Sequence, residues 1–511
     1  MTKRILCMLL VFCMLLPMAA CSGGTKPGGQ GGGGGGSGET DAVVWQDSIG
    51  DVVLDGEEVV VSVLDLYEYE MFGEEDSKDA LDQMLYKRNS ALQARFGVEL
   101  VSAPTQSSGP YDQQSHFDAV QSAMLNGDAD FDVVAMYAYQ SGKLITSEYY
   151  LDWRKDIPYC RDSIKAGADW WPKGINDDCT VCGSQYIAVS DICITAIEMV
   201  WSMVFNKDMV GDHNIAKKIG SQYESMYDVV DDGKWTLDVM QSTLKDFRIE
   251  QGDSTNAEDD VYGMMVQGST GVDAFAFSLG YHYVINDSVN VPELWTPTGG
   301  TISTLMTLRE FCHSQGVFYA YGMNKTDDDL ATFFAERHAL FATMPLEHLK
   351  KDIIHEMEDK FGVLPYPKLN ELQKKYLSGT VDHYSVLSVP YLNFNLTTTG
   401  AVVEAISAYN NYYINDLYYE SIVTHKNTRD PDSVRMIDII MDGRVYDLTT
   451  YHYNELIVSD ELDGALGLFF RYCVSNPTED IAAYWSSCLN FLPDDVMELI
   501  QDYNDISQGL V

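Results

Sequence analysis

Buried strands and amphipathic helices alternate along the first third of the chain. The run at 59–64, "VVVSVL", is β-branched and has no polar alternation, which is typical of a strand covered on both faces. Apolar residues recur at helical spacing over 79–96 and 113–125, and short strands are expected at 98–101 and 131–136. Strand, helix, strand, helix, strand at this spacing predicts a doubly wound parallel unit.

The same alternation recurs downstream and predicts a second group of elements. The expected strands are at 195–205, 261–266, 340–344 and 361–365. The expected helices are at 235–247, with Thr236 as its cap, and at 272–279, 327–338 and 346–360. From residue 398 onward the pattern is nearly all helical. Because a single sheet rarely contains so many strand–helix units, the pattern favours two α/β lobes over one.

Polar and aromatic residues follow several of the predicted strands. Tyr67 follows the first strand, Tyr137 and Tyr139 follow the third, Gln267 follows 261–266, and Glu347 follows 340–344. In open α/β sheets ligands bind beyond the carboxyl ends of the strands, so these side chains are candidates for a small polar ligand. The chain has 32 tyrosines, so the alternative for each of these rings is that it is partly buried and packs against the protein without binding a ligand.

The N-terminus has the layout of an export signal. A basic start precedes a short apolar run at 5–16 and small residues at 18–20, and the run is too short for a stable membrane span. Cys21 follows directly and resembles the lipidated cysteine of bacterial lipoproteins, and a glycine-rich stretch after it is typical of a flexible tether. We expect a signal peptide at 1–20 and a tether at 21–45. The alternative is an ordinary cleaved signal with an incidental cysteine.

The net charge and the spacing of the cysteines limit the classes of partner and cofactor that this protein is expected to bind. A formal charge of −44 disfavours binding to nucleic acid or to anionic membrane surfaces. The spacing of Cys179 and Cys182 suits a hairpin, in which residues three apart point to opposite faces, and no second pair completes a zinc site. We therefore expect thiols, no metal and no cofactor. A disulfide among the cysteines at 160, 179, 182 and 193 is the alternative.

Several segments spread along the chain resemble one known family. They are "FDVVAMYAYQSGKL", "ADWWPKGINDDCTVCGSQYIAVSD", "VFNKDMV", "GKWTLDVM", "ATFFAERHALFATMPLEHL" and "FGVLPYPK". Together they are similar to extracellular solute-binding proteins of bacterial ABC importers, the family 1 group that includes the maltose-type sugar binders. Cys182, Gln185 and the long helical C-terminus depart from the family pattern, which leaves the ligand open.

The resemblance implies an α/β fold of two lobes, the type II periplasmic-binding-protein fold, with hinge crossovers and a helical C-terminal part. The N-terminal lobe would comprise 46–155 plus 382–420, with 386–391 as the strand that returns to it. The C-terminal lobe would comprise 156–381 plus 421–511.

The resemblance also implies a binding function without catalysis. Hinge closure would capture a small polar solute, by default a mono- or oligosaccharide, and deliver it to permease subunits; peptides and other polar solutes are alternatives. The protein is expected to be a monomer on the extracellular face of the cell membrane, anchored by a lipid on Cys21. The candidate ligand-binding residues are Tyr137, Tyr139, Trp171, Gln267, Glu347, Tyr67 and Trp170. Of the adjacent tryptophans, at most one ring can enter a cleft.

A surface-anchored carbohydrate-active hydrolase is the enzymatic alternative. The chain has no G-x-S-x-G motif, and His355-Glu356 begins like a metalloprotease helix but has Asp359 where the second histidine is needed. A carboxylate pair for glycoside hydrolysis stays open, because its separation in space decides it. An adhesin of β-rich repeats is disfavoured, because no repeat at a fixed period is found.

Overall fold

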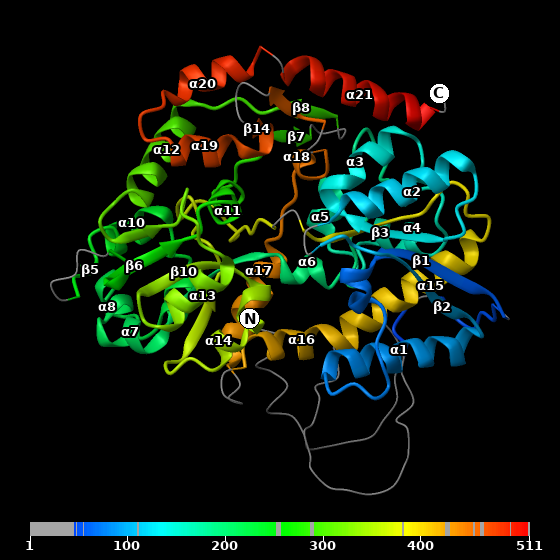
Figure 1. The fold of residues 1–511 in the computed structure, drawn as a ribbon, viewed down its shortest axis with the longest axis horizontal. Helices are drawn as coiled ribbons and strands as arrows, with labels where there is room; N and C mark the ends of the chain where they lie inside the picture. Colours follow the sequence, from blue (N-terminus) through cyan, green and yellow to red (C-terminus); the bar gives the residue numbers. More distant parts are fainter. Residues whose placement is uncertain are drawn as a thin grey trace, which may run out of the picture. The chain divides into compact units, whose positions relative to one another are not determined.

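The computed structural model describes residues 45–47, 49–54, 56–109, 112–251, 257–286, 291–380, 383–424, 430–452, 455–459, 464–490 and 492–508. The chain divides into two compact units, Met1–Val43 and Val44–Val511. The predicted signal peptide, most of the tether and Cys21 lie outside the described residues. The second unit contains two larger sheets (Figure 1).

The first sheet builds the first lobe. Its strands are β1 (Glu58–Leu64), β2 (Glu99–Thr105), β3 (Val133–Tyr137) and β12 (Ser385–Ser388), in the order β12-β3-β1-β2. β1 is parallel to both β2 and β3, so Val61 lies opposite Ser102 on one side and opposite Val133 on the other, whereas β12 is antiparallel to β3. The doubly wound parallel unit predicted from the first third of the chain is confirmed.

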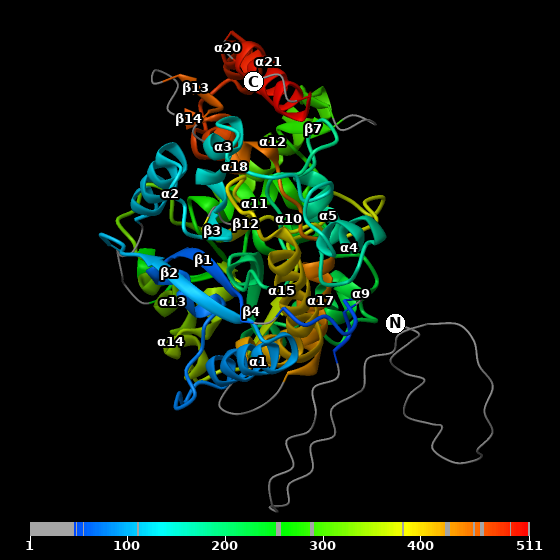
Figure 2. The same ribbon diagram turned by 90° about the vertical axis from the view of Figure 1, so that its right-hand side faces the viewer.

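Helices cover both faces of this sheet. The helices that follow its strands are α1 (Ala80–Phe96), α2 (Gln114–Asn126) and α3 (Ala138–Thr146). α2 and α3 lie on one side of the sheet and α1 on the other, and Figure 2 shows the same arrangement after a quarter turn. The Asp79 side chain caps α1 by accepting the Asp82 N–H, and Gly97 ends it in the left-handed region at φ 70°.

The second sheet builds the second lobe. Its strands are β4 (Trp201–Asn206), β5 (Arg248–Ile249), β6 (Val261–Val266), β9 (Val317–Tyr319), β10 (Ala339–Pro345) and β11 (Phe361–Leu364). The order is β11-β4-β10-β6-β5, and β9 also pairs with β6. β10 is parallel to β6 but antiparallel to β4. The carboxyl ends of β6 and β10 therefore lie at one edge, beside the start of β4.

The second lobe contains helices at the predicted positions 235–247, 272–279 and 327–338, with shifted ends, and further helices that the sequence pattern does not predict. Together these helices are α7 (Lys207–Asp212), α8 (Ile215–Ile219), α9 (Met226–Asp231), α10 (Leu237–Leu244), α11 (Thr270–Ser278), α12 (Gly299–Cys312), α13 (Asp327–Ala335) and α14 (Asp352–His355). A small two-stranded sheet, β7 (Val284–Asn286) and β8 (Pro292–Leu294), precedes α12. Thr236 caps α10 as predicted, because its side chain accepts the Val239 N–H.

Three predicted elements are wrong. The strand expected at 195–205 begins with a helical turn, α6 (Thr195–Glu198), because Glu198 is drawn into a buried hydrogen-bond network. The helix expected at 346–360 breaks into a 3-10 turn, Leu346–Lys350, and α14, because Lys351 is extended and pairs with Asp328. The hairpin expected around Cys179 is a tight turn closed by one isolated bridge, since residues 182 and 183 both have positive φ.

The segment before β4 packs against the first lobe. It contains α4 (Cys160–Ala166) and α5 (Lys173–Asp178). Ala188 pairs with Leu387 of β12, and the Cys160 thiol donates to the Gly400 carbonyl. The predicted lobe boundaries place this segment in the second lobe, but these contacts are with the first. Six cysteines, at 160, 179, 193, 312, 473 and 488, are buried free thiols.

One long helical rod connects the two lobes. α15 (Leu396–Tyr409) contacts β1 and α1 of the first lobe, and α16 (Asn415–Ile422) contacts the 3-10 turn after β10 in the second. A π-helical segment, Asn410–Ile414, joins them. Asn410 accepts from the Arg88 guanidinium and donates to the Asp191 carbonyl, so the wide turn is fixed from two sides.

The C-terminal part is mostly helical, as predicted. Its elements are α17 (Pro431–Asp442), α18 (Leu448–Tyr451), α19 (Phe469–Ser475), α20 (Ile481–Cys488), α21 (Leu492–Gln508), and the short strands β13 (Ile457–Ser459) and β14 (Gly464–Ala465). α17 packs on β11, and α21 contacts both β8 and α3. None of the helices in the described ranges combines the length and apolar character that crossing a membrane requires.

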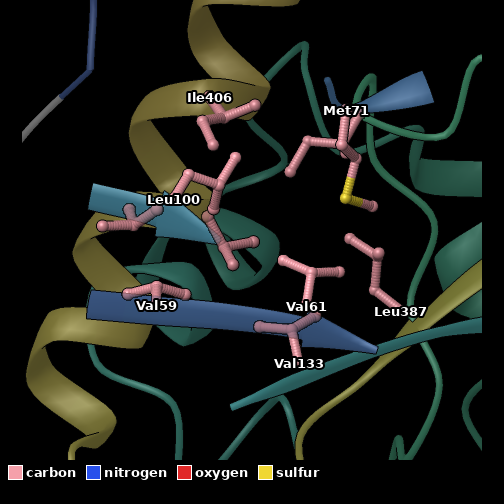
Figure 3. Close-up of a pocket in the computed structure, with 10 residues that line it drawn as sticks. Val59, Val61, Met71, Leu100, Val133, Leu387 and Ile406 are labelled. Atoms are coloured by element: carbon pink, nitrogen blue, oxygen red, sulfur yellow. The ribbon is translucent and has the colours of Figure 1, made fainter. Parts of the chain in front are cut away.

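The core of the first lobe contains a small void. Its volume is about 10 Å³, and aliphatic side chains from the sheet and α15, with Met71, surround it (Figure 3). Val61 and Val133 from paired strands point toward Ile406 of the helix. A space of this size without polar lining is a packing defect and not a ligand site.

Candidate ligand-binding site

A cavity of about 630 Å³ lies where the strand ends of the two lobes meet. The first lobe contributes the 3-10 turn after β1, Asp65–Glu70, and His383 just before β12. The second lobe contributes Trp201 at the start of β4 and the residues that follow β6 and β10. This volume suits a small molecule, and the position is the one that the strand-end rule predicts.

Aromatic rings form the first-lobe wall. Tyr67 and Tyr69 line the cavity, with ring centroids 6.3 Å apart. Tyr137 supports Tyr67 from behind in an edge-to-face contact at 4.7 Å. Tyr137 is 4% exposed, and its hydroxyl has no hydrogen-bond partner among the described residues. The wall offers flat apolar faces with polar tips, which suits stacking against a polar ring.

Gln267 presents one polar side chain from the second lobe. Its backbone N–H donates to Thr343 Oγ1 at 2.8 Å, which fixes the chain at the end of β6. Its Oε1 accepts the N–H groups of Ser269 at 3.0 Å and Gly271 at 2.9 Å. Because the amide oxygen is held at the start of α11, the amide nitrogen is the group that Gln267 can offer to a ligand.

Two carboxylates lie at the second-lobe edge of the cavity. Glu347 and Asp327 both line it, and both approach His348 Nε2, at 3.9 and 3.6 Å. Burial, followed by the charge of Glu198, raises the pKa of Glu347. Burial lowers the pKa of His348 to about 4, so its imidazole is neutral at neutral pH.

A buried carboxylate links the two lobes behind the cavity. Glu198 is 1% exposed and accepts from Tyr69 of the first lobe. It also accepts from Lys350 Nζ at 2.7 Å and from Tyr418 of α16. Glu70 lies close enough that the charge of Glu198, after burial, helps to raise the pKa of Glu70 to about 8. The network couples the turns after β1 and β10 through one side chain.

The structure brings three of the seven predicted ligand residues together in the cavity: Tyr67, Gln267 and Glu347. Tyr137 lies one layer behind, and Tyr139 is partly buried on α3, without lining the cavity. Trp170 and Trp171 lie elsewhere, since both indoles donate to Glu404 of α15, at 3.0 and 2.9 Å. Trp171 is 1% exposed, so the tryptophan pair anchors α15 and does not face the cavity.

Other lining residues are absent from the sequence-based prediction. Tyr69 obeys the same strand-end rule as Tyr67 and could have been selected by it. The sequence pattern predicts a longer strand at 195–205 with Trp201 in its interior, so it does not indicate that Trp201 lies at the start of a strand. Arg471 enters from α19 and is held by Asp273, with Nε and Oδ2 3.0 Å apart. These two residues are 198 positions apart, so no local pattern marks them.

No cluster of three or more metal-ligating side chains occurs within the described residues. Two of the cysteines, Cys179 and Cys193, are buried in the core.

Comparison with solved structures gives many matches of the same architecture. One is a cyclo/maltodextrin-binding protein in complex with maltotetraose, at 10% identity and TM-score 0.54, covering 86% of this chain and 97% of that one. Another is a sugar transporter from Rhizobium etli in an open conformation, at 12% identity and TM-score 0.55, covering 87% and 99%. The apo form of RafE from Streptococcus pneumoniae matches at 11% identity and TM-score 0.50, covering 86% and 98%.

No family model matches the chain, and no curated protein matches it. At 10–12% identity the structural matches establish the fold alone. That fold is the two-lobed α/β architecture of the matched structures, and the predicted fold class is confirmed.

Proposed function

We propose that this protein is the substrate-binding lipoprotein of a bacterial ABC importer. It captures a small polar solute, a mono- or oligosaccharide, by closure of its two lobes, and it delivers the solute unchanged to a membrane permease. The observation that carries the proposal is the cavity of about 630 Å³ whose walls come from both lobes. A ligand that touches both walls binds the closed form more tightly than the open form and shifts the population toward closure.

The composition of the cavity supports a carbohydrate. Tyr67 and Tyr69 supply ring faces, and Gln267, Asp327 and Glu347 supply donors and acceptors for hydroxyl groups. Two of the structures with this fold are described as a maltodextrin-binding protein and a sugar transporter, which agrees with the same ligand class.

The N-terminal pattern supports a lipid anchor on Cys21 at the extracellular face of the membrane. A flexible tether of the length of 21–45 would keep the binding unit close to its permease and raise its effective concentration there. The family 1 assignment rests on the sequence resemblance described above.

A thermal-shift screen of the purified protein against mono- and oligosaccharides tests this function. A ligand at about 100 times its dissociation constant adds about 2.7 kcal/mol to the free energy of unfolding, which raises the melting temperature measurably. Chromatography of the ligand after incubation should recover it intact.

Two results would contradict the proposal. A flat response to every sugar would exclude the carbohydrate assignment and direct the screen to peptides and other polar solutes. Recovery of a cleaved sugar would establish the hydrolase that the sequence left as the alternative.

A further inference from the structure

The cations around the cavity are already neutralised by protein carboxylates. Arg471 and Lys351 line the cavity, Lys350 is adjacent to Lys351 in the chain, and each of the three forms an ion pair with a carboxylate of the second lobe or of α6. The pairs are Arg471 with Asp273 at 3.0 Å, Lys350 with Glu198 at 2.7 Å, and Lys351 with Asp328 at 2.6 Å. An acidic ligand would have to compete with these carboxylates for each cation.

Asp327 and Glu347, in contrast, are carboxylates without a lysine or arginine within ion-pair distance among the described residues. Among the described residues, the basic group within 4 Å of either carboxylate is the imidazole of His348. That imidazole is neutral above about pH 4, because burial, together with the charge of Lys351, lowers its pKa. The lysines at 350 and 351 act on Glu347 from further away, and their effect is smaller than that of burial and Glu198.

The two carboxylates converge on one place. Both approach the same atom, His348 Nε2, and both side chains keep about two-fifths of their surface exposed, at 41% and 42%. A single group in front of His348 can therefore meet both acids at once. Such a pair of uncompensated anions at a partly desolvated edge favours a cation over a neutral hydroxyl.

The aromatic side chains of the cavity add to this preference. Tyr67, Tyr69 and Trp201 line the same cavity, and ring faces attract an ammonium group. Trp201 is 2% exposed, and its indole N–H has no hydrogen-bond partner among the described residues. A buried donor without a partner indicates that a polar ligand atom completes the site.

We propose that the ligand carries a protonated amine, as an amino sugar does, and that the amine binds between Asp327 and Glu347. The inference rests on the proposed function and narrows it to cationic carbohydrates. The paired state of Arg471, Lys350 and Lys351 disfavours uronic and phosphorylated sugars.

Calorimetric titration with matched probes tests this preference. The probes are glucose, glucosamine and glucuronate, and the β-1,4-linked dimers of glucose and of glucosamine, all at one ionic strength. Within each matched set the amine should bind at least about tenfold tighter than the neutral sugar, and glucuronate should bind weakest of the three monosaccharides. Glu347→Gln should reduce the ratio of amine to neutral affinity several-fold.

Two further variants make the test decisive. Asp327→Asn should reduce the same ratio, and it serves as a second probe if Glu347→Gln fails to fold. Glu371→Gln is the matched control, because Glu371 pairs with Lys234 and does not line the cavity, and it should leave the ratio unchanged.

The outcomes separate the two proposals. Neutral sugars that bind as tightly as amines, or a ratio that neither variant changes, would overturn the cationic ligand and leave the carbohydrate function standing. Absence of binding by every sugar, whatever its charge, would overturn both.

Discussion

Glu70 is a buried carboxyl group in the 3-10 turn after β1. It is 1% exposed, and it accepts a hydrogen bond from Ser385 at 3.0 Å. Burial is the main cause that raises its pKa to about 8, so the folded protein holds Glu70 protonated at neutral pH. Unfolding releases that proton, because an exposed glutamate ionises near pH 4.3.

This proton makes stability depend on pH. Because the folded-state pKa is raised, the folded protein binds more protons than the unfolded chain between about pH 4.3 and pH 8, and stability falls as pH rises through that window. In Glu70→Gln the group no longer titrates. The melting temperature of the variant relative to the parent should therefore rise steadily from pH 5 to pH 8.

The control for this measurement lies on the same turn. Glu68 is only partly buried, and the pH profile of Glu70→Gln is compared with that of Glu68→Gln, which makes the same substitution two residues away. A profile for Glu70→Gln that is parallel to that of the parent would show that Glu70 is ionised in the folded state.

At the scale of elements, the residue that ends a helix determines where the chain changes direction toward the next strand. α2 ends at Gly127, which has φ 71° and no atom within 4 Å of where a side-chain Cβ would lie. Alanine there would meet no clash, and its whole cost would be the left-handed backbone conformation.

Gly127→Ala should lower the free energy of unfolding by about 1 kcal/mol, as measured by urea titration. Gly109→Ala is the matched control, since this glycine also has open space around it and does not have a positive φ. The control should change stability by less than about 0.5 kcal/mol. Equal losses in both variants would contradict the assignment of the cost to backbone conformation.

The elements that the sequence predicts well are those with a regular pattern and a local stop signal. The strands at 59–64 and 261–266 have uninterrupted apolar runs, and the helix at 79–96 ends at a glycine, so their positions are predicted closely. Prediction fails between residues 160 and 200, where polar side chains such as Glu198 find buried partners far along the chain. The spacing of apolar residues within one segment cannot indicate partners that lie in distant segments of the chain.

At the scale of the whole molecule, the contact between Tyr69 and Glu198 joins the turn after β1 to the turn after β10. The strand-end rule points to the location of the cavity and to three of its lining residues, because the rule depends only on topology. It could not predict Arg471 or Trp201, because their places depend on how the C-terminal helices and β4 pack.

Tyr69→Phe should weaken closure of the two lobes. It removes one donor to a buried charged acceptor, a loss of about 1.5–3 kcal/mol, while Glu198 keeps Lys350 and Tyr418. Small-angle X-ray scattering of the ligand-free protein should give a larger radius of gyration for this variant. Tyr86→Phe is the control, because its hydroxyl bonds to exposed Glu75 within one lobe; an unchanged radius in Tyr69→Phe would contradict the role of this contact.

The π-helical segment in the rod between the lobes has a consequence for how the chain tolerates changes in length. A π-helical turn accommodates one residue more than the α-helical hydrogen-bonding pattern allows. Deleting a single residue from Asn410–Ile414 would restore regular winding and leave the side chains of α16 close to their present angular positions. The same deletion within α15 would turn every side chain of α16 by about 100° around the axis and move Tyr418 away from Glu198, so the chain tolerates the loss of a residue at one place in the rod and not at the other.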